Sequence, residues 1–125
     1  MNTNVAPEIR EVMEALHYRP SVSVILPFKT KINLETELRY AFKIASDKVE
    51  QELTNSYPAE MAALLMKKLT EIIKNITVDK NKKGIAIYVS PVFEIVLFLD
   101  VAVEEKIIID ESFEIRDLVY SKKQL

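Results

Sequence analysis

Hydrophobic positions follow helical spacing through most of the first two thirds of the chain and form strand-like runs in the last third. Apolar residues recur every three or four positions over 33–53, and again over 58–76. A shorter stripe begins at Pro7 and ends before Pro20, because a proline disfavours helical geometry in the residue that precedes it. This spacing predicts three helices, of which the second and third are long.

A short strand is expected between the first and second helices. Over residues 21–26, Val22 and Val24 alternate with serines, which places the valines on one face of an extended chain. Pro27 marks the end of this strand.

The stretch 84–109 is apolar enough to resemble a membrane span. Glu94 and Asp100 would then lie at a depth where acids are rare, and Pro91 interrupts the run. Its β-branched and aromatic residues favour strands instead, and the near-continuous apolar character indicates that both faces are buried in the middle of each strand. Three or four strands are predicted, over 85–90, 92–100, roughly 101–109 and, as the fourth, 113–119.

The resulting element order, α-β-α-α-β-β-β, predicts a single α+β domain over residues 1–125. Its sheet should be mixed or mostly antiparallel with four to five strands, because the last connections are too short for parallel crossovers. Of the three helices, we expect the two long ones to pack on the faces of the sheet. The predicted core consists of Val22, Val24, Leu38, Phe42, Leu65, Ile87, Ile95 and Leu97.

The composition removes several classes of site. The chain has no cysteine, which excludes disulfides, thiolate metal sites and a cysteine nucleophile. Its single glycine, Gly84, cannot by itself form a dinucleotide-binding turn or a Walker loop. The lone histidine, His17, would be needed for a Ser-His-Asp triad, but the sequence has no nucleophile elbow to accompany it. We interpret His17 as a surface or helix-capping residue. We therefore expect no catalytic residue, no cofactor and no enzyme activity.

The acidic residues fall in groups that lack metal-binding spacing. The pairs 104–105 and 110–111, and Glu114 with Asp117, match neither an EF-hand nor an HExxH motif. Charges beside exposed strands commonly prevent edge-to-edge association, and we interpret these acids in that way, with no metal site. Glu94 interrupts an apolar strand and is expected at a strand end or facing solvent; a buried carboxylate there would instead suggest a general acid.

Basic residues form two groups with the chemistry to contact RNA phosphates. Arg39 and Lys43 lie one helical turn apart beside a basic loop, and a second group precedes Gly84. The net charge of −2 lacks the basic excess of a general nucleic-acid binder, so a solvated surface is the alternative interpretation. The candidate RNA-binding residues are Lys29, Lys31, Arg39, Lys43, Lys80, Lys82 and Lys83.

Three segments together resemble a known family. They read PSVSVILPFKT at 20–30, NLETELRYAFKIASDKVEQEL at 33–53, and KKGIAIYVSPVFEIVLFLD followed by KIIIDESFEIRDLV within 82–119. These segments are similar to the N-terminal domain of the bacterial relatives of archaeo-eukaryotic peptide-chain release factors. The resemblance covers nearly the whole chain and includes the Leu-Pro strand end, the Ser-Pro turn and the closing Arg-Asp-Leu.

The resemblance implies a three-domain parent in which residues 1–125 correspond to the first domain. In that family the peptide-releasing Gly-Gly-Gln loop belongs to the central domain, and a chain with one glycine cannot supply it. Members of that family that read stop codons use an Asn-Ile-Lys-Ser loop and a Tyr-x-Cys motif. The segment KNIT at 74–77 matches the first motif only in part, and the second motif requires a cysteine that the chain lacks. We therefore expect a noncatalytic, cytoplasmic recognition domain associated with the ribosome or RNA, with no membrane partner, stop-codon reading or peptide release.

Two other functions stay open at this point. The acidic balance favours a protein-interaction or scaffolding domain that makes no RNA contact. A small-molecule enzyme would need a pocket that joins residues 27–33 to Glu94. A continuous positive face would support RNA binding, and a flat apolar patch would support the interaction domain. A deep cleft that holds Glu94 would support the enzyme.

Overall fold

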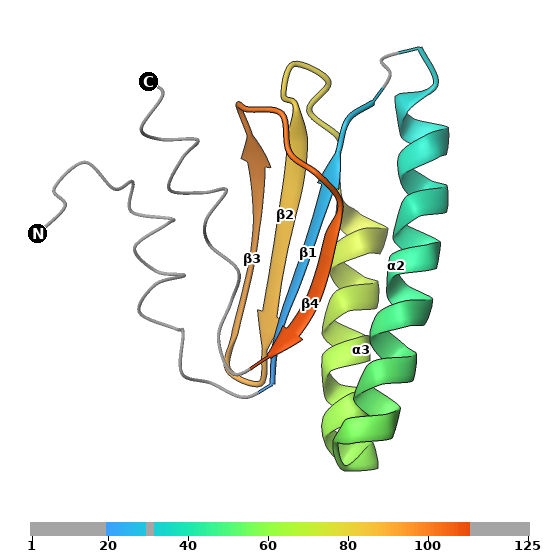
Figure 1. The fold of residues 1–125 in the computed structure, drawn as a ribbon, viewed down its shortest axis with the longest axis vertical. Helices are drawn as coiled ribbons and strands as arrows, with labels where there is room; N and C mark the ends of the chain where they lie inside the picture. The colour runs from blue at the N-terminus through green and yellow to red at the C-terminus, as the bar shows by residue number, and fades with distance from the viewer. Residues whose placement is uncertain (1–19, 30–31, 111–125) are drawn as a thin grey trace, which may run out of the picture.

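The computed structural model describes residues 20–29 and 32–110, which form a four-stranded antiparallel sheet with two helices (Figure 1). This arrangement confirms the α+β class. The helix predicted from Pro7 and the strand predicted over 113–119 lie outside the described residues. The elements are β1 (Ser21–Pro27), α2 (Leu34–Ser56), α3 (Ala59–Asn75), β2 (Gly84–Ser90), β3 (Phe93–Leu99) and β4 (Lys106–Asp110).

The strands lie in the order β3-β2-β1-β4, and every neighbouring pair is antiparallel. β1 therefore has a partner on each side, whereas β3 and β4 are the outer strands of the sheet over the described residues. This is the spatial order of a Greek key, with the pair α2–α3 in place of the hairpin between the first two strands.

Residues 100–105 cross the sheet from β3 to β4, as Figure 1 shows at the upper end of the sheet. The prediction of a strand over 101–109 is therefore wrong in its first half, since β4 begins only at Lys106. Neighbouring strands lie about 4.8 Å apart, so a connection between the outer strands has to cover about 14 Å. The apolar residues that open the predicted strand provide that crossing.

The crossing connection passes close to Gly84, the first residue of β2. A Cβ atom at this position would lie 2.8 Å from Val103 Cγ2 and 3.0 Å from the carbonyl oxygen of Leu26. Both distances are shorter than ordinary van der Waals contact. The only glycine of the chain is thus explained by a close approach of another segment rather than by a phosphate-binding turn.

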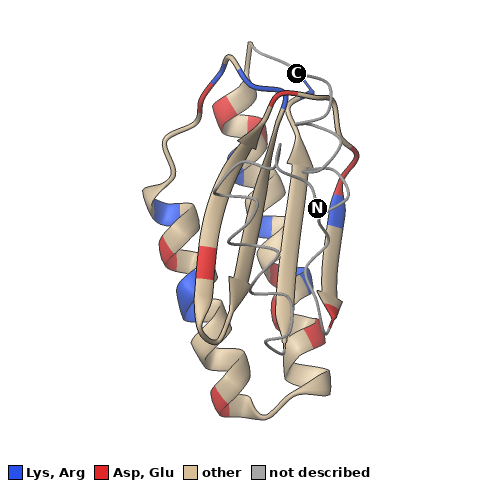
Figure 2. Cartoon of the chain, turned by 90° about the vertical axis from the view of Figure 1, so that its left-hand side faces the viewer, with Lys and Arg blue, Asp and Glu red and all other residues tan. Residues whose placement is uncertain are grey.

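Both helices cover the same face of the sheet, α3 behind β2 and β3 and α2 behind β1 and β4 (Figure 2). The two long helices do pack on the sheet, as expected, but on one of its faces rather than on both. Only Tyr57 and Pro58 join them. A connection of that length holds two helices side by side and cannot carry the chain around an edge of the sheet.

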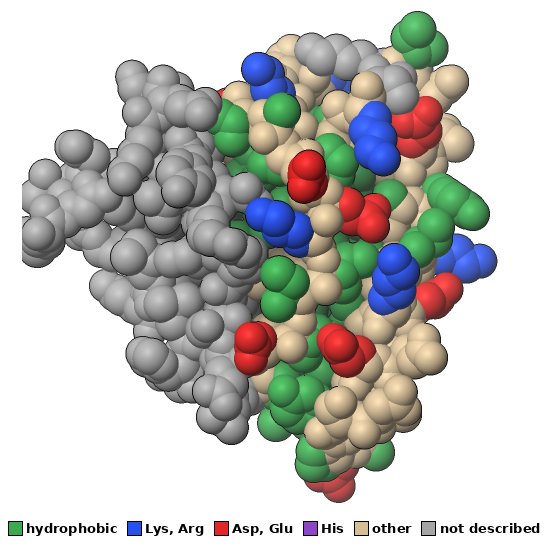
Figure 3. All heavy atoms as spheres, viewed as in Figure 1, with side chains coloured by type: hydrophobic (Ala, Val, Ile, Leu, Met, Phe, Trp, Pro, Cys, Tyr) green, Lys and Arg blue, Asp and Glu red, His purple; other side chains and the backbone are tan. Residues whose placement is uncertain are grey.

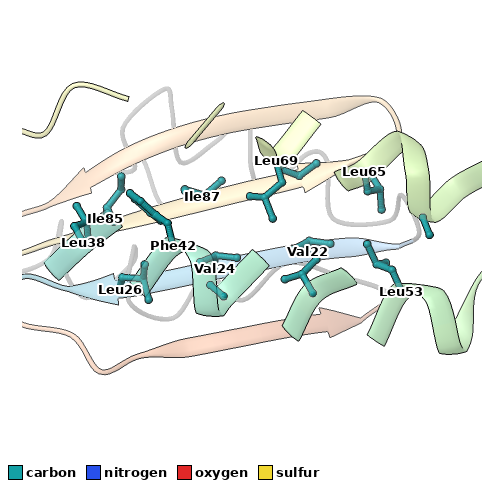
Figure 4. Close-up of a cluster of buried hydrophobic side chains, with 14 residues drawn as sticks. Val22, Val24, Leu26, Leu38, Phe42, Leu53, Leu65, Leu69, Ile85 and Ile87 are labelled. Carbon is teal, nitrogen blue, oxygen red and sulfur yellow. The ribbon is translucent and has the colours of Figure 1, made fainter. Parts of the chain in front are cut away.

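The hydrophobic core lies between this helical layer and the sheet (Figure 4). Alternate residues of β1 and β2 point into it, and each helix contributes one apolar stripe, as the helical spacing predicts. Six of the predicted core residues are buried: Val22, Val24, Leu38, Phe42, Leu65 and Ile87.

The other two predicted core residues, Ile95 and Leu97, are only partly buried and lie on the opposite face. Val96 pairs opposite Ile87 and packs against the core from β3. Side chains alternate along a strand, so a register with Val96 facing the helices turns both neighbours away from them. A continuous apolar run does not reveal which alternate set faces the core, and the prediction chose the wrong set.

β2 is buried on both faces, as the apolar run predicts, whereas β3, which belongs to the same run, is mostly half-buried. β1 is also buried on both faces, except at Pro27. On the face away from the helices, Ile25, Ala86 and Tyr88 have no exposed surface. Among the described residues, no helix is both long and apolar enough to cross a bilayer.

Lys68 of α3 fixes the turn between β2 and β3. Its ammonium donates hydrogen bonds to the carbonyl oxygens of Ser90, at 3.1 Å, and Pro91, at 3.0 Å. Proline fixes φ near −65° and so cannot begin the type I′ or II′ turn that two-residue hairpins prefer. Lys68 therefore supports a hairpin whose own turn residues are not the favoured ones.

Replacement of Gly84 by Ala should lower the free energy of unfolding by about 1–3 kcal/mol, because the added methyl group overpacks the contact with Val103. In a Val103→Ala background the same replacement should cost less, since the nearest atom is removed. Urea denaturation of the four proteins measures this. Additive effects would show that the crossing connection does not restrict this position.

Replacement of Lys68 by Met should lower the free energy of unfolding by about 1–2 kcal/mol, because two carbonyl groups lose a charged donor. The control is Lys67→Met, which changes an exposed neighbour and should cost less than about 0.5 kcal/mol. Equal losses in the two variants, measured by denaturation, would contradict the role assigned to Lys68.

Candidate nucleic-acid interface

Two loops meet at one end of the sheet and bring together basic residues that lie far apart in the sequence. The backbone N–H of Phe28 donates to the carbonyl of Lys83 at 2.9 Å, and the N–H of Lys83 donates to the carbonyl of Leu99 at 2.8 Å. These bonds extend the sheet ladder beyond the last paired residues, Pro27 and Gly84. Lys29 directly follows the residue that bonds to Lys83, so the two predicted basic groups adjoin along the backbone.

A turn that begins at Asp79 shapes the second of these loops. The Asp79 side chain accepts a hydrogen bond from the N–H of Asn81 at 3.0 Å, and its carbonyl accepts one from the N–H of Lys82 at 3.2 Å. An aspartate that bonds the backbone two residues on is typical of a tight turn. The exposed Lys80 lies within this turn.

Lys82 differs from its neighbours because its charge is already paired. Its ammonium lies 2.6 Å from Asp100 Oδ1, and the side chains of both residues are 33% exposed. This hydrogen bond raises the pKa of Lys82 above its ordinary value of 10.5, with help from the charges of Asp100 and Asp79 and against a partial loss of hydration. Lys82 thus ties the loop to the crossing connection.

Arg39 joins the two helices near the same end of the molecule. Its Nη1 donates to the carbonyl of Ile73 at 3.3 Å, and its Nη2 lies 4.0 Å from Glu35 Oε1. The Ile73 carbonyl is one of the last four of α3, which have no partner within the helix. Arg39 is therefore a helix-capping contact, while Lys43 is exposed one turn further along α2.

The structure thus joins Lys29, Lys80 and Lys83 at the meeting point of the two loops, with Arg39 and Lys43 extending from it along α2. Lys31 lies outside the described residues. The sequence did not reveal that the two basic groups are adjacent, because this depends on β1 pairing with β2. We call residues 28–29 and 79–83 together the loop end.

Acidic residues accompany the lysines. Lys29 shares a hollow of about 190 Å³ with Glu37 and Glu105, above an apolar floor that includes Leu38 and Ala41. Figure 3 shows blue and red side chains interleaved on the face that it presents. Figure 2 shows blue segments in the loops at the upper end of the sheet, also beside red ones. The described surface is of mixed charge, with its basic residues most concentrated at the loop end.

The pocket required for a small-molecule enzyme does not form from the described residues. Glu94 pairs opposite Val89, next to the β2–β3 turn, whereas Pro27 pairs opposite Gly84 at the other end of the sheet. Glu94 is exposed, which agrees with the interpretation that it lies at a strand end or faces solvent. The described residues also contain no cluster of three or more metal-binding side chains.

The acidic residues that we interpreted as preventing edge-to-edge association lie in different parts of the structure. Glu104 and Glu105 are exposed in the crossing connection rather than in a strand, and Asp110 is the exposed last residue of β4. Glu111, Glu114 and Asp117, like His17, lie outside the described residues.

A scan against protein-family models finds no match to this chain, and a search of curated proteins finds no significant one. The resemblance to the release-factor relatives therefore depends on the segments quoted above.

The Lys82–Asp100 pair should stabilise the fold in a pH-dependent manner. Because the folded-state pKa of Lys82 is raised, its contribution is fully present below about pH 10.5 and is lost as the pH rises through the folded-state value. The wild type should therefore exceed Lys82→Met in stability at about pH 8, and the difference should narrow at about pH 11. Denaturation at both pH values measures this, with Lys80→Met as the control; a difference that stays constant would contradict the assignment.

Proposed function

We propose that this chain is a noncatalytic recognition domain that binds RNA phosphates through its loop end. The observation that carries the proposal is the hydrogen bond between Phe28 and Lys83, which places Lys29 beside the basic turn. The side chains of Lys29, Lys80 and Lys83 form no ion pair or hydrogen bond with the described part of the chain. Three lysines from two adjacent loops are suited to contact successive phosphates.

The ligand is proposed to be ribosomal RNA, and the place of action the cytoplasm. The resemblance to the N-terminal domain of release-factor relatives supports this choice. A lysine ammonium is a compact point charge, and it binds phosphate without the planar fork with which arginine reads a base edge. Phosphate contacts carry no sequence information, so the domain would bind many RNA sequences about equally, without reading stop codons or releasing peptides.

Binding should weaken steeply with salt, because each phosphate contact releases counterions. In a plot of log affinity against log salt, each contact contributes a slope of about −0.9 for a duplex and about −0.7 for single strands. The double reversal Lys29→Glu/Lys83→Glu should therefore reduce the slope by about 1.4–1.8 and weaken binding to all sequences alike. Filter binding to ribosomal RNA or intact ribosomes measures both effects.

The matched control is Lys67→Glu/Lys74→Glu, which makes the same charge change on exposed positions of α3. It should alter the slope much less than the loop-end reversal. Reversal at Arg39 and Lys43 should have an intermediate effect, and the Arg39 change also removes a contact to α3. An affinity that changes neither with salt nor with any of the three charge reversals would contradict RNA phosphate binding.

A second candidate function is a protein-interaction domain without RNA contact. Tyr40 and Ile44 lie one turn apart on α2, and their side chains are exposed by 68% and 37%. Large apolar side chains paired on an exposed helix face are a common feature of protein contacts. Loss of partner binding in Tyr40→Ser/Ile44→Ser, with RNA affinity absent in the wild type, would favour this function.

A further inference from the structure

A groove between α3 and the edge strand β3 combines an apolar floor with an acidic rim. Its volume is about 470 Å³, and it includes Ile72 and Ile76 from the helix and Val96 and Phe98 from the strand. Each of these four side chains is partly buried against the core, so each also presents surface to the groove. Glu71 and Glu94 border this floor from opposite sides.

The topology explains why these residues are left partly uncovered. β3 is the outer strand of the described sheet on this side, and α3 contacts β2 more than β3 (Figure 2). Val96 and Phe98 face the helical layer at a position where no further helix of the described chain covers them. The ring of Phe98 packs edge-on against Phe28, with the ring centroids 6.3 Å apart, which holds the floor in place.

The two carboxylates determine what kind of partner the groove suits. Glu94 follows the same alternation as Val96 and Phe98, so it projects on the groove side of β3. Neither Glu71 nor Glu94 forms an ion pair or a hydrogen bond with the described part of the chain. Two carboxylates of like sign beside one apolar floor would be complemented by a ligand that carries positive charge on both sides of an apolar group.

We propose that this groove binds a short basic and apolar segment of another protein. One or two aliphatic side chains lie on the floor formed by Ile72, Ile76, Val96 and Phe98, and flanking lysine or arginine side chains pair with Glu71 and Glu94. From Glu94 to Phe98 the strand extends about 13 Å, enough for about four extended residues. This surface touches the loop end only through the ring contact between Phe98 and Phe28, and the proposal does not depend on RNA binding.

The test uses the fluorescein-labelled peptide Lys-Ile-Lys-Leu-Lys and measures its binding by fluorescence anisotropy. Two control peptides replace either the apolar residues by serine or the lysines by glutamate. The double variant Glu71→Gln/Glu94→Gln should bind the basic peptide at least about threefold more weakly, since each exposed ion pair contributes a modest amount. Glu50→Gln/Glu52→Gln, which removes two exposed carboxylates on α2, is the matched control and should bind as the wild type does.

The location of binding is tested by the methyl resonances of Ile72 and Ile76, which should shift on titration with the basic peptide. Both control peptides should leave these resonances unchanged. A loss of less than threefold in the double variant, equal binding of the serine peptide, or shifts confined to Ile44 on α2 would each overturn the proposal. All substituted positions are exposed, so these variants should fold as the wild type does.

Discussion

The pairing of β4 with β1, rather than with β3, is the constraint on which the other features of the molecule depend. It gives β1 a partner on each side, and every residue of that strand except Pro27 is buried. It also sends residues 100–105 across the sheet, which accounts for the close contact between Val103 and Gly84. Finally, it leaves β3 as an outer strand, whose half-covered side chains line the groove beside α3.

The two proposed binding surfaces arise from the same sheet at different places. The loop end is formed where β1 and β2 finish their pairing and two backbone hydrogen bonds carry the ladder into basic loops. The groove is formed along the outer strand, where Glu94 interrupts an apolar run. Their charges are opposite in sign, which would allow an acidic and a basic partner to bind at the same time. Such an arrangement is consistent with a chain whose net charge is close to zero.

Local features of the sequence predicted the fold class, both long helices and most of the core. The stripe that includes Leu38 and Phe42 identified the buried side of α2, and Ser90-Pro91 correctly separated β2 from β3. These predictions succeed because helical spacing and proline act within a few residues of the chain.

Features set by tertiary pairing could not be predicted in the same way. Within the continuous apolar run, Ile95 and Val96 are equally suited to the core. Only the pairing of Val96 opposite Ile87 of β2 shows that Val96 faces the core. Similarly, the strand expected from residue 101 is a connection because β4 has its partner on the far side of the sheet. The adjacency of Lys29 and Lys83 and the capping contact of Arg39 also join segments that are distant in sequence.

The central functional claim is that RNA phosphate binds at the loop end. Amide resonances observed during titration with a single-stranded oligoribonucleotide test this claim most directly. The account predicts shifts concentrated at Phe28, Lys29 and the turn over 79–83, all of which disappear as salt is raised. Shifts centred on the groove between α3 and β3, or no shifts even at low salt, would contradict it.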